Sequence, residues 1–173
     1  MKTFLKNYDV NQLANIYLRY KDQFNILPDN LIEKLHIMLM EQFELIADKI
    51  LFTNESCDDY EENKEFYKKT GMIKVNRLNN NSILFPGELN LYFRAWHDDI
   101  HYYYNLPFGF DGELQTFYHH VSLISDEQIK QILFSEIVLQ TAYYEKFGKF
   151  PDKQKVILIN YEKLELPSTI NCM

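Results

Sequence analysis

The residues with the clearest capacity for chemistry lie within 94–120, which reads RAWHDDIHYYYNLPFGFDGELQTFYHH. His97 and His101 are four residues apart, a spacing that brings both imidazoles to one face of a helix, as in helical zinc sites. That face continues along apolar residues, so we expect both rings to point toward the core. An HxxxH pair on an aromatic-rich helix also occurs as two packed core histidines, and this alternative stays open.

Two carboxylates are placed to complete a metal site. Asp98 lies one step round the same helix, where it could bind an ion or orient a histidine. Glu113 follows a break at Pro107 and Gly109 and falls in the first turn of the next predicted helix, where the helix dipole favours a carboxylate. A tight return of the chain would bring it opposite the histidines. Such a donor set suits Zn²⁺ or Fe²⁺ and leaves positions open for water or substrate.

Further candidates lie on the two helices predicted after this break. At about 100° per residue, His120 returns to the face of Glu113, whereas His119 points about 120° away, toward solvent. His120 is therefore a candidate for an extra ligand or a catalytic acid or base, with a helix-surface histidine as the alternative. Glu136 and Gln140 edge an apolar stripe, and a buried Glu needs a partner. Glu136 could support the site or act as acid or base, with a boundary ion pair as the alternative.

The sequence HDDIH at 97–101, followed by eleven residues and Glu113, resembles the HDxxH-x11-E zinc motif of a coenzyme Q biosynthesis family. That family is implicated in C1 oxidative decarboxylation and in assembly of the ubiquinone enzymes. The Gly112–Glu113 pair is similar to the Gly-Glu of the same family. The resemblance covers about 17 of the 173 residues. It implies that the metal ligands are His97, Asp98, His101 and Glu113.

The same stretch also resembles uncharacterised helical proteins of large tailed phages. In those proteins a His-Asp-x-x-His helix and a Gly-Glu pair precede a helix with Glu-x-x-x-Gln. Glu136 and Gln140 have this last spacing here. This resemblance implies a site without naming a substrate.

The elements that must position these residues are predicted to be helices. Only 5 Gly and 5 Pro occur in 173 residues, which favours long helices with short connections. Aromatic residues make up 16%, which indicates a core of large side chains. The predicted fold is an all-α single domain over 1–173, a bundle of about six helices. Helices are expected over 10–24, 30–51, a short stretch to about 69, 87–104, 112–124, 127–147 and 151–164, with a short hairpin or a long loop near 72–85.

Capping residues set several of these boundaries. Asp9, Asp111 and Asp126 are expected N-caps, and Gly71 and Gly148 are expected to end helices. The acidic segment 52–65 is expected to be a solvated loop and the start of a helix, and the tail after 164 to be irregular.

Charge and composition exclude several classes of protein. Twenty-five acidic against 18 Lys and Arg residues give a net charge of −7, which argues against a nucleic-acid binder and a polybasic membrane anchor. No apolar stretch reaches the 18 residues expected of a membrane span, and the N-terminal segment lacks the apolar region of a signal peptide. Cys57 and Cys172 form no CxxC motif, so we expect free thiols and a cytoplasmic location in a bacterial or virus-infected cell.

Two functions are compatible with these features. The first is a metal-dependent hydrolase, lyase or decarboxylase in which bound Zn²⁺ or Fe²⁺ activates water or an oxidant and His120 or Glu136 acts as acid or base. Its substrate would be small and lipophilic or aromatic. The second is a non-enzymatic, virus-encoded acidic protein that binds a protein partner, with a structural metal or none. An open coordination position favours the first, and four protein ligands favour the second.

Overall fold

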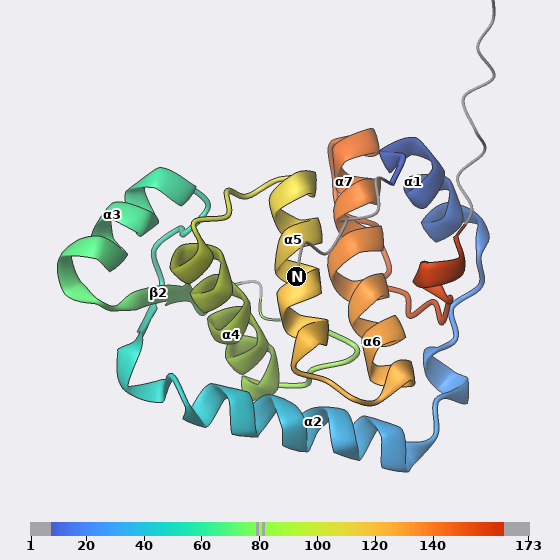
Figure 1. Ribbon diagram of the computed structural model, residues 1–173, viewed down its shortest axis with the longest axis horizontal. Helices are drawn as coiled ribbons and strands as arrows, with labels where there is room; N and C mark the ends of the chain where they lie inside the picture. Colours follow the sequence, from blue (N-terminus) through green and yellow to red (C-terminus); the bar gives the residue numbers. More distant parts are fainter. Residues whose placement is uncertain (1–7, 79, 81, 165–173) are drawn as a thin grey trace, which may run out of the picture.

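The computed structural model describes residues 8–78, 80 and 82–164, and most of them are helical (Figure 1). The helices are α1 (Val10–Arg19), α2 (Asp29–Glu44), α3 (Tyr60–Thr70), α4 (Glu88–Tyr104), α5 (Phe110–Ser122), α6 (Glu127–Leu133) and α7 (Gln140–Phe147). A π-helical segment, Phe134–Leu139, joins α6 to α7 without a break. Counting this run as one, the described residues form six helices, in agreement with the predicted number.

The helix ends follow the capping residues in most places. The carboxylate of Asp9 accepts a hydrogen bond from Asn11 N at 2.7 Å, and that of Asp126 accepts one from Gln128 N at 3.0 Å. Gly71 ends α3 in the left-handed region that favours glycine, with φ 70°. These local signals explain why the starts of α1 and of the long run from 127 to 147, and the end of α3, were predictable. The predicted helix over 10–24 ends earlier, at Arg19.

The fold is mostly helical but not strictly all-α, because it contains a small parallel sheet. Strand β1 (Ile50–Thr53) pairs in parallel with β2 (Ile73–Asn76), with Ile50 opposite Ile73. The predicted helix over 30–51 therefore ends early, at Glu44, and the segment near 72–85 is neither a hairpin nor only a loop. Parallel strands need a crossover connection, and α3 provides it. Ile73 is fully buried, so β2 is held by the core as well as by its partner strand.

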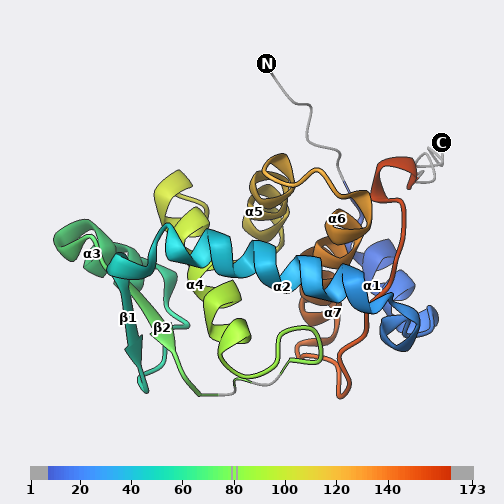
Figure 2. The same ribbon diagram turned by 90° about the horizontal axis from the view of Figure 1, so that it is seen from below.

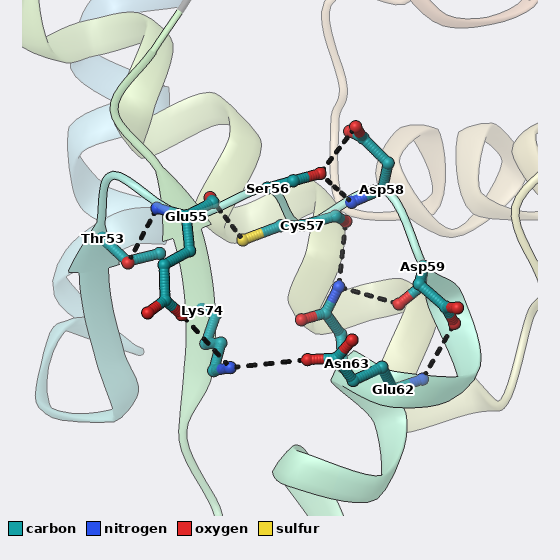
Figure 3. Close-up of polar contacts among 9 residues, drawn as sticks. All are labelled: Thr53, Glu55, Ser56, Cys57, Asp58, Asp59, Glu62, Asn63 and Lys74. Carbon is teal, nitrogen blue, oxygen red and sulfur yellow. Dashed lines mark hydrogen bonds and ion pairs between the residues drawn. The ribbon is translucent and has the colours of Figure 1, made fainter.

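Polar contacts hold the loop between β1 and α3 (Figure 3). The buried side chain of Asn63 donates to Cys57 O at 2.9 Å and to Asp59 O at 2.8 Å, which ties the loop to the first turn of α3. Lys74 of β2 forms an ion pair with Glu62 at 3.9 Å. From residue 54 onward the acidic segment is thus a loop and a helix start, as predicted, while its first two residues belong to β1. Cys57 is a free thiol, and the second cysteine lies outside the described residues.

The segment after α7 is extended, so the predicted helix over 151–164 is wrong. Ile157 is fully buried, and its backbone N–H donates to Ser135 Oγ at 3.0 Å. Lys155 N donates to Tyr17 OH at 2.9 Å. Side chains from α1 and the π-helical segment replace the helical hydrogen bonds, and within 151–164 the only helical turn is the 3₁₀ turn Tyr161–Lys163. The predicted irregular tail lies outside the described residues.

The helices pack so that α5 lies between α4 on one side and the α6–α7 run on the other (Figure 1). Helix α2 runs across the ends of these helices and contacts both α4 and α6 (Figure 2). The largest fully buried side chains are aromatic: Tyr17, Phe85, Phe117 and Phe134. No described helix has both the length and the apolar character that crossing a membrane requires.

Candidate metal centre

The connection between α4 and α5 places the two helices side by side. Asn105 ends α4 with φ 60°, a conformation that Asn tolerates better than most residues. Gly109 is the N-cap of α5, and Asp111, predicted as this cap, lies inside the first turn instead. Gly112 packs against the connection so closely that a Cβ added there would lie 1.7 Å from Pro107 O. This contact fixes where the next residue, Glu113, enters the site.

His97, His101 and Glu113 converge between these helices. The His97 Nε2 and His101 Nε2 atoms are 3.0 Å apart. Glu113 Oε2 lies 3.0 Å from His97 Nε2, and Glu113 Oε1 lies 3.4 Å from His101 Nε2. Among the described residues, this is the group whose ligand atoms all lie within 4.8 Å of one another. The fourth predicted ligand, Asp98, is not part of this group, and its role as a ligand stays a prediction.

These separations match those of a coordination shell. Zinc binds imidazole nitrogen and carboxylate oxygen at about 2.0–2.2 Å, so two ligands of a tetrahedral ion lie roughly 3.3 Å apart. The three observed separations, 3.0, 3.0 and 3.4 Å, are close to this value. The residues therefore fit a small divalent ion with little rearrangement.

The backbone sets the orientation of His101. Its Nδ1 lies 2.9 Å from Leu106 O, while Leu106 N donates to His101 O at 2.8 Å. Because a carbonyl oxygen can only accept, Nδ1 carries a proton, and Nε2 is the ring atom directed at the other ligands. Phe108 packs edge-on against the same ring, with centroids 5.1 Å apart. The sequence could not predict the Leu106 contact, because every residue type has a backbone carbonyl.

His120 extends the cluster on the far side of His97. His120 Nε2 lies 3.2 Å from His97 Nδ1, and the two rings are nearly parallel, with centroids 5.4 Å apart. His120 is fully buried, and Trp96 packs edge-on against it at 4.0 Å. The alternative of a helix-surface histidine is therefore wrong for this residue. His119 is turned away and stacks on Tyr104 at 3.7 Å.

Burial and neighbouring charges together set the pKa values of the ionisable groups of the cluster. Burial lowers the pKa of His97, but the carboxylates around it, Glu113 first and then Asp98 and Glu136, together outweigh this effect and the net pKa is raised. Burial alone would raise the pKa of Glu113, yet the two imidazoles hold it well below its usual range. For His120, burial and the nearby histidines both lower the pKa far below its ordinary value, so this ring stays neutral. Burial raises the pKa of Asp98 to about 6, against the opposing effect of His97 and His101.

Glu136 lies in the π-helical segment and is held by two amides. Gln154 Nε2 donates to both of its carboxylate oxygens, at 2.7 and 2.6 Å, and Gln140 Nε2 donates to Oε2. Ile83 N donates to Gln154 Oε1 at 2.7 Å, which fixes the orientation of that amide. Among the described residues, the hydrogen-bond partners of Glu136 are thus amides rather than the cation of an ion pair. Burial raises the pKa of Glu136 to about 7, although both amides oppose the shift.

A cleft of about 1440 Å³ lies near the cluster, although His97, His101 and Glu113 do not line it. Phe93 lines it and also packs against the rings of His97 and His120, with centroids 5.8 and 6.1 Å away. Glu136 and Gln140 line the same cleft, which brings the two residues of the predicted Glu-x-x-x-Gln pair to its wall. Most of the lining side chains are polar, in contrast to the lining expected around the lipophilic or aromatic substrate predicted from the sequence.

Comparison of the chain with protein-family models, curated proteins and solved structures found no match. The resemblances to the coenzyme Q biosynthesis family and to the phage proteins therefore stay predictions.

Proposed function

We propose that this protein is a metal-dependent enzyme that binds one divalent ion, Zn²⁺ or Fe²⁺, through His97, His101 and Glu113. The observation that carries the proposal is the set of three ligand separations of 3.0–3.4 Å. The orientation of His101 supports it, since a proton held on Nδ1 leaves Nε2 free to bind an ion.

The number of ligands supports a catalytic rather than a structural ion. Structural zinc sites are closed by four protein ligands, whereas two histidines and one carboxylate are typical of hydrolytic zinc and non-haem iron sites with open positions. When bound, such an ion would polarise a water molecule or a substrate oxygen. A 173-residue chain can also bury enough apolar surface to fold without a metal.

Glu136 is the proposed acid or base. It lines the cleft, and its raised pKa of about 7 suits proton transfer at neutral pH. The two amides would hold the carboxylate in place while a proton is gained or lost. Phe24 and Phe150 offer faces for an aromatic substrate, and the polar remainder of the cleft favours one that also carries hydrogen-bonding groups. The reaction class proposed is hydrolysis or a lyase reaction.

Metal content and coordination test this proposal. Elemental analysis of the purified protein should give one zinc or iron per chain, and the Glu113→Gln and His101→Ala variants should lose it while remaining helical by circular dichroism. Azide added to the Co²⁺-substituted protein should change its visible spectrum, because an open position accepts an outside ligand. A metal-free native protein would refute the proposal. A spectrum insensitive to azide would favour the structural alternative.

A further inference from the structure

We propose that His120 is a positioning residue of this metal centre: its Nε2 accepts the proton of His97 Nδ1 and so keeps His97 Nε2 directed at the ion. The inference rests on the proposed function, since it concerns how the same three ligands are held. In this role His120 contacts a ligand, and it neither binds the ion nor transfers a proton to substrate.

Each ligand histidine has a proton on Nδ1 that needs a hydrogen-bond acceptor. A neutral histidine that binds an ion through Nε2 carries its proton on Nδ1, and that proton needs an acceptor when it is buried. For His101 the acceptor is Leu106 O, at 2.9 Å. For His97 the atom within hydrogen-bonding distance of Nδ1 is His120 Nε2, at 3.2 Å. His120 thus has the same role for one ligand that a backbone carbonyl has for the other.

His120 is poorly suited to a purely structural role. Its ring is fully buried, and its Nδ1 has no hydrogen-bond partner among the described residues. A buried polar atom without a partner destabilises a fold, and an apolar side chain could make the contacts with Phe93 and Trp96 equally well. The feature of His120 that an apolar residue cannot supply is the acceptor facing His97.

A comparison of variants separates positioning from packing. His120→Leu keeps an apolar side chain in the pocket but removes the acceptor, whereas His120→Gln restores an acceptor at about the reach of Nε2. His119→Leu is the matched control, since it makes the same change on the neighbouring residue, which stacks on Tyr104 away from the ligands. Zinc affinity is measured for each purified protein by competition with a chromogenic chelator, and melting temperature is measured without metal.

We expect His120→Leu to weaken zinc binding about 10- to 100-fold, the usual cost of losing a contact that orients a ligand. We expect His120→Gln to recover most of that affinity and His119→Leu to bind as the native protein does. Without metal, the melting temperature of His120→Leu should change little, because losing the acceptor of the His97 proton offsets the gain from removing the unpartnered Nδ1 of His120.

Two results would overturn the inference: native zinc affinity in His120→Leu, or equal weakening in the Leu and Gln variants. The native protein is measured in the same titration. If it binds no zinc, the proposed function itself fails, so the two failures are distinguishable.

Discussion

The tightest steric contact around the metal centre predicts that Gly112→Ala will damage the site without touching a ligand. An added Cβ would lie 1.7 Å from Pro107 O and 2.9 Å from Pro107 C, whereas real Cβ atoms essentially never come within 3.0 Å of a heavy atom outside their own and the adjacent residues. Both contacts are with backbone, so no side chain can rotate out of the way. Either the connection or the start of α5 must move by more than about 1 Å, well beyond the roughly 0.2 Å tolerance of metal–ligand distances.

The expected effect has two parts. Overpacking costs about 1–3 kcal/mol, and at roughly 2–4 °C per kcal/mol the melting temperature should fall by several degrees. Zinc affinity should fall at least about tenfold, because Glu113 follows Gly112 directly and moves with it. Thermal unfolding by circular dichroism and chelator competition measure the two parts separately.

Gly148→Ala is the matched control. Gly148 has φ 69°, so the substitution strains the backbone by about 1–2 kcal/mol, but no atom lies within 4 Å of the added Cβ. It should therefore lower the melting temperature by a similar amount and leave zinc affinity unchanged. Native zinc affinity in Gly112→Ala, or an equal loss of affinity in both variants, would show that this contact does not set the position of Glu113.

Three further predictions follow from the buried polar groups. Because the pKa of Glu136 is raised from 4.5 to about 7, the metal-free protein should lose up to about 3 kcal/mol of stability as the pH rises through that interval. Glu136→Gln should lack this part of the pH dependence. Identical urea unfolding profiles of the native protein from pH 5 to 8 would contradict the shift. Ser135→Ala should cost about 1–3 kcal/mol, because it leaves Ile157 N and Lys155 O without their partner, and a change below about 0.5 kcal/mol would be inconsistent with that role. Chelation of bound metal should lower the melting temperature by less than about 15 °C if the ion is catalytic, and a larger drop would indicate a structural ion.

The parts of the fold that were predictable depend on local signals. Asp9 and Asp126 cap their helices through their own neighbours, and Gly71 and Gly148 end helices through their own backbone angles. The parts that were not predictable depend on distant residues. Strand β1 forms because a segment more than 20 residues further along the chain pairs with it, and the extended path after α7 forms because side chains of α1 and the π-helical segment satisfy its backbone.

The same distinction applies to the site. The spacing of His97 and His101 follows from helix periodicity alone, and the break at Pro107 and Gly109 correctly suggested the return that brings Glu113 opposite them. The prediction for His120 located its face of the helix but not its contact, since helix geometry gives a direction and not the identity of the neighbouring ring. The orientation of each imidazole depends on a second partner that lies beyond the motif.

The connection between α4 and α5 explains why eleven residues separate His101 from Glu113 in this chain. Leu106 O orients His101, and the carbonyl of the next residue, Pro107, is the atom against which Gly112 packs. One short connection thus fixes both the direction of a histidine and the start of the helix that carries Glu113. One residue inserted between Gly109 and Glu113 would turn the carboxylate by about 100° around α5, away from the histidines. An eleven-residue separation is therefore required by this turn, whether or not the resemblance to any family holds.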